Sequence, residues 1–285
     1  MRVAPVIILE PAQAASPLVI DSPHSGRDYP ADFTYICPQP LLRQTEDFLV
    51  DELIAGAVGA GATVIAATFP RSYIDVNRAE NDIDPAVLAE AWRVPLELTE
   101  RTMLGLGLVR RLCATGVPVY AAPLATQTVQ HRIDHYYRPY HTALEQAVAH
   151  RLRLFGASYL LNCHSMPSGG HEEIRSPRAD FILGDRNGTS CDLAFTRRVH
   201  VLLQDMGYSV ALNEPYKGME IVRRHGDPAK GRHALQIEIN RRLYMDERKL
   251  EKHESFAELQ SNLNRFFANL ATELMNETAI PLAAE

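Results

Sequence analysis

Two stretches of the chain share one pattern, in which a short apolar run ends in a polar turn that carries a histidine. The first is Pro17–Gly26 (PLVIDSPHSG), and the second is Tyr159–Pro167 (YLLNCHSMP). Short apolar runs bounded by Ser, Pro or Gly are typical of buried strands. His24 and His164 therefore fall at strand ends, where open α/β sheets bind their ligands. If the two strands are neighbours, the histidines converge, and we interpret them as two ligands of one metal ion.

A helical pattern follows the first histidine, with apolar residues at 41, 42, 48, 49 and 53 of the stretch 41–55. A glycine-rich turn ends this helix near residue 60, and 62–69 is predicted to be the next strand. Glu46 and Asp47 lie at or just before the working face of the helix. A carboxylate here could complete a His/carboxylate/His site, although a solvated acidic turn is the default explanation for Glu46, Asp51 and Glu52.

The segment His233–Arg242 predicts a strand of unusual content. Leu, Ile and Ile at 235, 237 and 239 alternate with Gln236, Glu238 and Asn240, so one face is apolar and the other polar. An exposed edge strand would explain this alternation. In a metalloenzyme, Glu238 is instead the carboxylate expected to act as general base, because a metal-bound water needs a nearby proton acceptor.

Elsewhere the pattern is less specific. Strands are predicted at 117–122 and from Asp180, and helices lead from His131 to 154, over 191–206 and, as an amphipathic tail helix, over 246–275. His131 and His135 belong to a histidine cluster without the spacing of a zincin, so we leave the cluster out of the metal site.

Composition narrows the class of protein. The chain has 285 residues, 46% of them hydrophobic and 22% charged, as expected for one large or two small soluble α/β domains. A net charge of -6 without a Lys/Arg run argues against nucleic-acid binding, and no apolar stretch is long enough to span a membrane. Four scattered cysteines without a C-x-x-C pair fit a reducing, cytoplasmic location. Cys163 adjoins His164, but alternation along a strand points it to the other face, so it is interpreted as buried filler.

One loop carries a candidate anion site. Arg71, Asn77 and Arg78 follow the predicted strand 62–69, and Asp75 is available to hold a guanidinium in place. Guanidinium and amide groups are suited to binding a carboxylate through forked hydrogen bonds. Loop arginines usually make weak surface ion pairs, but two arginines and an asparagine beside a strand end favour a site.

Taken in order, several short segments of the chain resemble the N-formylglutamate amidohydrolases along most of its length. They are Asp21–Gly26, Thr45–Asp47, Arg71–Arg78, Asn162–Ser165, Gly184–Arg186, Leu235–Arg241 and Tyr244–Asp246. The segment Arg71–Arg78 is also similar to part of the aspartoacylases and zinc carboxypeptidases. The resemblance implies a single catalytic domain over 1–285. Its fold would be a three-layer α/β/α, zinc-exopeptidase-like (phosphorylase/hydrolase-like) arrangement with a mixed, mostly parallel central sheet.

The resemblance also implies roles for individual residues. His24, Asp47 and His164 would bind one Zn²⁺ ion, with Glu46 as the fallback for Asp47. Arg71 would polarise the scissile carbonyl, and Glu238 would act as general base and acid. Further residues would bind substrate: Asn77 and Arg78 the α-carboxylate, and Lys217, Arg223 or Arg241 a second carboxylate.

The activity implied is zinc-dependent hydrolysis of an N-acyl amino acid, above all N-formyl-L-glutamate, in histidine degradation. Two alternatives stay open at this stage. One is a carboxypeptidase-like metallopeptidase, which would need an open groove in place of a closed basic pocket. The other is a non-catalytic protein that binds a metal or a small molecule. The expected partner is a small-molecule substrate, with no nucleic acid and no membrane, and a homo-oligomer is left open.

Overall fold

The computed structural model describes residues 4–12, 14–169 and 179–278. Its strands are β1 Val6–Leu9, β2 Leu18–Ser22, β3 Thr63–Ala67, β4 Leu112–Ala114, β5 Val117–Pro118, β6 Ser158–Met166, β7 Phe181–Gly184, β8 Val210–Leu212, β9 Arg232–Asn240, β10 Met245–Asp246 and β11 Glu251–Lys252. Its α-helices are α1 Gln39–Arg43, α2 Val50–Ile54, α3 Glu100–Met103, α4 Thr126–Arg132, α5 Arg138–Phe155, α6 Leu193–Asp205, α7 Glu220–His225 and α8 Phe256–Thr278. Short 3₁₀ or π turns are η1 Ala55–Ala60, η2 Pro85–Val87, η3 Ile133–Tyr137, η4 Pro228–Lys230 and η5 Arg241–Leu243.

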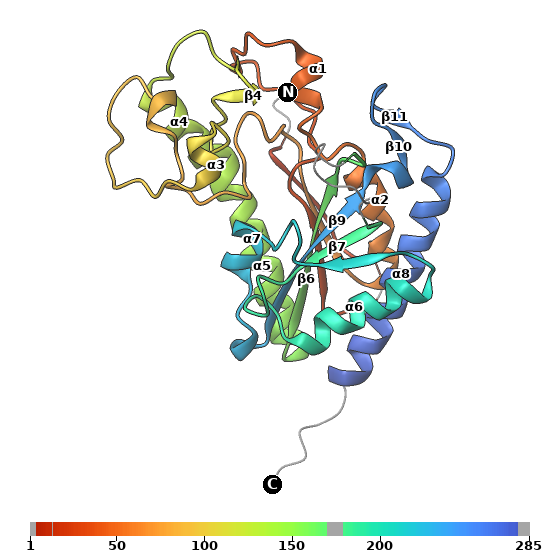
Figure 1. Cartoon of the computed structure of the whole chain (residues 1–285). Helices are drawn as coiled ribbons and strands as arrows, with labels where there is room; N and C mark the ends of the chain where they lie inside the picture. The colour runs from red at the N-terminus through yellow and green to blue at the C-terminus, as the bar shows by residue number, and fades with distance from the viewer. Residues whose placement is uncertain (1–3, 13, 170–178, 279–285) are drawn as a thin grey trace. The chain divides into compact units, whose positions relative to one another are not determined.

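A mixed, mostly parallel sheet lies at the centre, with helices on both sides (Figure 1). Its seven strands run in the order β1-β3-β2-β6-β9-β7-β8. β6 pairs in parallel with both β2 and β9, whereas β7 pairs antiparallel with β9. The predicted fold class is therefore confirmed.

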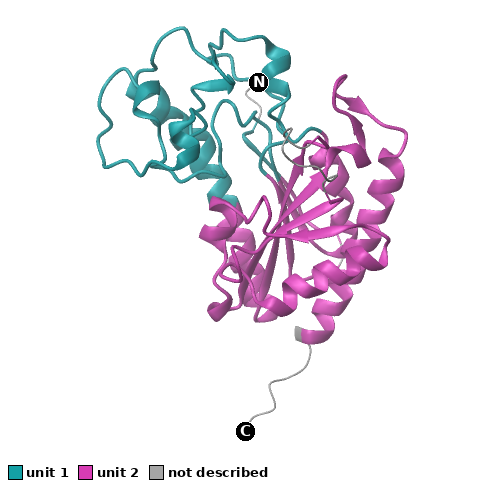
Figure 2. Ribbon diagram, in the orientation of Figure 1, with its two compact units in different colours: residues 1–7, 23–48, 66–143 teal, residues 8–22, 49–65, 144–285 magenta. Residues whose placement is uncertain are grey.

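The chain divides into two compact units, each built from separate stretches of sequence (Figure 2). Unit 1 comprises residues 1–7, 23–48 and 66–143, and unit 2 comprises 8–22, 49–65 and 144–285. Unit 2 contains β2, β6, β7, β8 and β9 together with α2, α6, α7 and α8. Unit 1 contains the loops that follow β2 and β3. The expected single catalytic domain over 1–285 stays a prediction.

The helix predicted over 41–55 is wrong as one continuous element. The structure has α1 and α2 instead, and between them the chain leaves the helix for residues 44–49. Leu49 takes a left-handed conformation with φ of 65°, which no helix continues through. The backbone N–H of Asp47 donates to the carbonyl of His24 at 3.0 Å, so a contact between residues distant in sequence stabilises the interruption between α1 and α2. Asp47 therefore lies in a loop.

Two further expectations are corrected by the structure, one for β9 and one for the tail helix. The edge-strand explanation of β9 is wrong, since β9 lies between β6 and β7 and Gln236, Glu238 and Asn240 are all buried. The tail helix begins at Phe256, ten residues later than predicted, because β10 and β11 form a small antiparallel ribbon first. The predicted strand 62–69 and the predicted helix 191–206 are confirmed with shorter bounds, as β3 and α6. The helix predicted from His131 to 154 is formed by α4, the π turn η3 and α5 in succession.

Register brings the polar positions of three strands into line. Asp21 of β2 lies opposite Asn162 of β6, which lies opposite Gln236 of β9. Two residues further along, His164 of β6 lies opposite Glu238 of β9. Because side chains alternate along a strand, Asn162 and His164 share one face of the sheet with Gln236 and Glu238. The chain leaves β2 at Ser22, so His24 follows at the carboxyl end of the neighbouring strand.

Candidate active site

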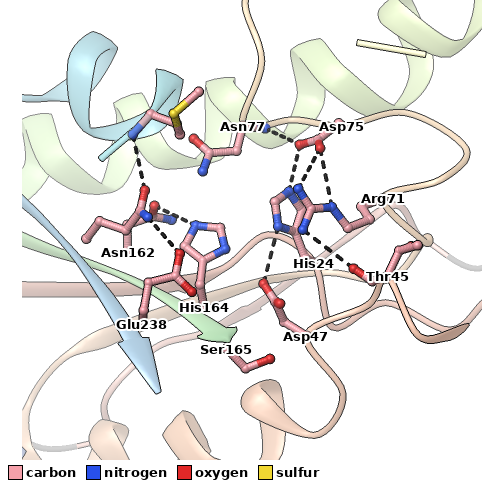
Figure 3. Close-up of polar contacts among 12 residues, drawn as sticks. His24, Thr45, Asp47, Arg71, Asp75, Asn77, Asn162, His164, Ser165 and Glu238 are labelled. Carbon is pink, nitrogen blue, oxygen red and sulfur yellow. Dashed lines mark hydrogen bonds and ion pairs between the residues drawn. The ribbon is translucent and has the colours of Figure 1, made fainter. Parts of the chain in front are cut away.

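His164 and Glu238 are each held by an amide two residues earlier on the same strand. The Nε2 atom of His164 lies 2.8 Å from Oδ1 of Asn162, and the Nε2 amide of Gln236 donates to Oε1 of Glu238 at 2.8 Å (Figure 3). Both functional side chains are buried, with 3% of His164 and 7% of Glu238 exposed. Each strand thus contributes one functional group and one neutral group that orients it.

Asp21 orients the amide that contacts His164. The Nδ2 group of Asn162 lies 3.0 Å from both carboxylate oxygens of Asp21, and both residues are fully buried. An amide that donates to a carboxylate must present its oxygen in the opposite direction. That oxygen therefore accepts the Nε2–H of His164, which leaves Nδ1 of His164 as the ring nitrogen with a lone pair.

In unit 1, His24 lies between two carboxylates (Figure 3). Its Nδ1 atom is 3.3 Å from Oδ2 of Asp47, and its Nε2 atom is 2.7 Å from Oδ1 of Asp75. All three residues are almost completely buried. When Nε2–H donates to Asp75, Nδ1 has a lone pair that it can offer to a metal ion, and a carboxylate in this position makes a histidine a better ligand.

Asp75 also fixes Arg71, as the sequence led us to expect. Its Oδ2 atom accepts from Nη2 of Arg71 at 2.8 Å and from Nε at 3.3 Å. Arg71 further donates to the carbonyl of Thr45 at 3.5 Å. Burial alone would raise the pKa of Asp75, but the positive charge of Arg71 and the contact with His24, including its hydrogen bond, outweigh it and hold that pKa well below its usual value. Asp75 is thus a carboxylate anion that links Arg71 to His24.

The three predicted metal ligands form a buried group. His24, Asp47 and His164 each offer one ligand atom, and these atoms lie within 4.8 Å of one another. Two neutral imidazoles and a carboxylate are a common donor set of catalytic zinc. Two ligands bonded to a tetrahedral zinc ion at about 2.05 Å lie about 3.3 Å apart, which is the separation of His24 Nδ1 and Asp47 Oδ2. The residues present therefore fit such an ion.

Glu46, the fallback ligand, points elsewhere. It accepts a hydrogen bond from the hydroxyl of Tyr29 at 2.5 Å and one from Nε of Arg43 at 3.1 Å. Burial raises the pKa of Glu46 to about 7, although Tyr29 and Arg43 act in the opposite sense. Within the described ranges, the group that could hold a metal contains Asp47 and lacks Glu46.

The predicted substrate-binding residues lie in different surroundings. Asn77 and Arg78 are buried in unit 1, where the Asn77 N–H donates to Asp75 and Nε of Arg78 donates to the carbonyl of Leu106 at 3.2 Å. In unit 2, Arg223 forms two hydrogen bonds with Glu220, and more than half of its side chain is exposed. Arg241 is buried and donates to Ser165 at 3.0 Å, and Lys217 lies in the loop before α7. Their roles stay predictions.

Sequence reasoning missed the residues that orient the candidate ligands and base. Asn162 and Gln236 stand two residues before His164 and Glu238, and this period-2 spacing is a signal that the sequence does contain. The contact of Asp75 with His24 and that of Asp21 with Asn162 have no such signal, since each depends on a pairing distant in sequence.

A mixed α/β sheet with a buried His/carboxylate/His group is the kind of site that hydrolases with a catalytic metal ion use. The comparisons with known proteins agree. The model of the family described as N-formylglutamate amidohydrolase matches residues 16–245. The chain therefore belongs to the N-formylglutamate amidohydrolase family, whose members are hydrolases of a carbon–nitrogen bond other than a peptide bond.

Relatives and solved structures support this membership. The chain is 31% identical to an N-formylglutamate deformylase of Pseudomonas putida over 82% of its length and 84% of the relative's, and 31% identical to that of Pseudomonas aeruginosa over 81% and 83%. A crystal structure of N-formylglutamate amidohydrolase from Ralstonia eutropha superposes with a TM-score of 0.93 at 44% identity, covering 96% of this chain and all of the other. A protein of Agrobacterium tumefaciens, with a TM-score of 0.58 at 16% identity and 96% of both chains covered, shares the fold alone.

No helix in the described part of the chain is both long and apolar enough to cross a membrane.

Proposed function

We propose that this chain hydrolyses N-formyl-L-glutamate to formate and L-glutamate, with one zinc ion held by His24, Asp47 and His164. The observation that carries the proposal is this buried group of three ligands, in which Nε2 of each histidine contacts a side-chain oxygen, that of Asp75 for His24 and that of Asn162 for His164. Family membership and the names of the Pseudomonas and Ralstonia proteins support the choice of substrate.

The chain's own side chains supply the remaining chemistry. Glu238, held by Gln236, would take a proton from the attacking water and pass it to the leaving amine. Arg71, held by Asp75, would donate to the carbonyl oxygen as negative charge develops there. Asn77 and Arg78 would hold the α-carboxylate through an amide and a guanidinium. A bound zinc ion would contribute Lewis acidity and lower the pKa of water.

The test is formate release from N-formyl-L-glutamate by the zinc-loaded protein. N-acetyl- and N-succinyl-glutamate, N-formyl-aspartate and a dipeptide are assayed alongside for release of the free amine. We expect N-formyl-L-glutamate to be the best substrate. The variant Glu238→Gln should retain one equivalent of zinc by elemental analysis and lose activity by about 100-fold to 10,000-fold, the range typical of general acid–base groups. Glu251→Gln, which changes an exposed carboxylate on β11, is the matched control and should keep full activity.

Different results would lead to different conclusions. Cleavage of the dipeptide alone would establish the metallopeptidase alternative. Zinc binding without turnover of any substrate would favour a non-catalytic binding protein. Full activity of Glu238→Gln would remove Glu238 from the proposed mechanism while leaving the substrate assignment intact. The expected role in histidine degradation and the cytoplasmic location stay predictions.

A further inference from the structure

Unit 1 buries more positive charge around Asp75 than Asp75 can neutralise. Besides Arg71, the side chains of Arg78 and Arg110 are buried beside it, with 5% and 7% of each residue exposed. The nearest guanidinium nitrogen of Arg110 lies 4.0 Å from Oδ2 of Asp75, the oxygen that already accepts two hydrogen bonds from Arg71. The other oxygen of Asp75 accepts from His24 and from the N–H of Asn77.

Backbone pairing fixes the position of Arg110. The N–H of Asp75 donates to the carbonyl of Leu108 at 2.8 Å, and the N–H of Leu108 donates to the carbonyl of Asp82 at 2.8 Å. Between Leu106 and Leu108 the chain passes so close to this partner that a Cβ at Gly107 would lie 2.7 Å from the Asp82 carbonyl oxygen. Arg110 lies two residues after Leu108, so these two backbone hydrogen bonds fix the segment that places Arg110 beside Asp75.

The charges in this cluster do not balance. Arg71, Arg78 and Arg110 carry three positive charges, and Arg71 and Arg110 both pair with the carboxylate of Asp75. The charges of Asp82 and Arg101 act on Arg78 in opposite senses, and Asp82 accepts hydrogen bonds from Thr99 and Thr102. Arg78 and Arg110 therefore share the charge of Asp75 with Arg71, which lies closer to it.

Two buried guanidinium nitrogens in this cluster also lack a hydrogen-bond acceptor among the described residues. Nη1 of Arg78 and Nε of Arg110 are buried without a hydrogen-bond partner anywhere in the described stretches of the chain. Burial and then the charge of Arg71 lower the pKa of Arg110 to about 9 despite Asp75, so the cation is under-compensated. At neutral pH the guanidinium is still protonated, and a buried cation without acceptors is costly unless a ligand pairs with it.

We propose that Arg110 binds the side-chain carboxylate of a dicarboxylic N-acyl amino acid. It would thereby select N-acyl-glutamate over analogues whose side chain is uncharged. The inference rests on the proposed function and names the residue that recognises the side-chain carboxylate of the substrate. A substrate with an α-carboxylate on Arg78 and a second carboxylate on Arg110 would give each of these buried guanidinium groups a negative charge to pair with. Arg223, one of the candidates predicted from sequence, already has Glu220 as its ion-pair partner and is largely exposed.

The test compares two isosteric substrates, N-formyl-L-glutamate and N-formyl-L-glutamine, in each variant. Their ratio of kcat/KM values does not depend on the folded fraction of a preparation, so a destabilised variant still gives an answer. The wild type should prefer N-formyl-L-glutamate, and Arg110→Gln should reduce this preference by about 100-fold, mainly through KM for the glutamate substrate, since removing one partner of a buried charge pair is costly. Arg111→Gln is the matched control, because Arg111 is paired with Asp84 at 2.6 Å and its side chain is one-third exposed. This control should leave the ratio unchanged.

A binding experiment separates this inference from the proposed function. Glutarate and its isosteric monoamide, glutaramate, are titrated calorimetrically into the wild type and Arg110→Gln, without any need for turnover. We expect tighter binding of glutarate to the wild type and equal binding of the two ligands to the variant. Binding of glutarate that depends on Arg110, in a protein that hydrolyses neither formyl substrate, would sustain the inference and overturn the proposed function. Hydrolysis with an unchanged substrate ratio in Arg110→Gln, or glutarate binding unaffected by the substitution, would overturn the inference.

Discussion

The two candidate metal-binding histidines are oriented by different means. His24 in unit 1 donates directly to the carboxylate of Asp75, which arginines surround. His164 in unit 2 contacts the neutral amide of Asn162, and the nearest carboxylate in that chain of contacts, Asp21, lies one residue further away. Both arrangements leave Nδ1 as the ring nitrogen for a metal ion. One uses charge for this purpose, and the other uses an amide.

The difference follows from the neighbours of each histidine. A buried carboxylate is stable beside His24 because Arg71 and Arg110 offset its charge. His164 lies opposite Glu238 in the sheet, where a second carboxylate would repel the proposed base. Asn162 and Gln236, which lie opposite each other, orient His164 and Glu238 without adding charge. An amide thus serves where the catalytic carboxylate must keep its own electrostatic surroundings.

The largest effect should come from removing the charge of Asp75. Asp75→Asn keeps the shape of the side chain but leaves the arginines without their carboxylate, and breaking a buried ion pair typically costs about 3 to 5 kcal/mol in the free energy of unfolding. Zinc affinity should also fall about 10-fold to 100-fold through His24. Urea denaturation measures the first effect, and competition with a chromophoric chelator measures the second.

Asp227→Asn provides the control for Asp75. Asp227 forms ion pairs with Lys230 and Arg232 at the surface, where solvent screens the charges so that such pairs contribute little to stability. If both substitutions lowered stability equally, the arginines around Asp75 would not depend on its charge, and the contrast between the two histidines would lose its electrostatic basis.

Asn162→Leu tests the amide on the other side. The substitution removes the acceptor for His164 Nε2 and the two hydrogen bonds that Asp21 receives, in a fully buried location. We expect zinc affinity to fall about 10-fold, at the lower end of the range for residues that orient metal ligands. Chelator competition measures this fall, and an unchanged affinity would show that His164 needs no orienting partner.

Gln236→Leu is the counterpart on β9. It removes the hydrogen bond to Glu238 and the acceptor for the N–H of Met219, while Asn162 and His164 are left intact. We expect kcat to fall about 10-fold because the proposed base is less well positioned, with zinc affinity and KM nearly unchanged. Loss of zinc in this variant would contradict the division of roles between β6 and β9.

These contrasts also show how far the sequence alone can lead. The two strand-end histidines were predictable because an apolar run followed by a polar turn is a local signal, and the mixed sheet was predictable from the family resemblance. The position of Asp47 was not, because the helix is interrupted by a contact with His24 and by the left-handed Leu49. The polar face of β9 could not be told from an exposed edge, since alternation does not reveal whether the polar side meets solvent or an active site. Arg110 follows a glycine-rich stretch without periodicity, and only its ion pair with Asp75 in the structure identifies it.

The smallest effect is expected at Cys163, which adjoins His164 in sequence but alternates to the opposite side of β6. Its thiol is buried and contacts the carbonyl of Leu161, and burial raises its pKa well above the usual value. Cys163→Ala should lower the free energy of unfolding by about 1 kcal/mol through lost packing and leave zinc affinity and kcat unchanged. Asn162 precedes Cys163 in sequence but shares a strand face with His164, and its substitution should lower zinc affinity. Comparing Cys163→Ala with Asn162→Leu therefore tests whether the effect on His164 depends on the face of the strand or on proximity in sequence. A loss of zinc affinity in Cys163→Ala equal to that in Asn162→Leu would mean that the strand is perturbed as a whole, and the specific role of the amide would have to be abandoned.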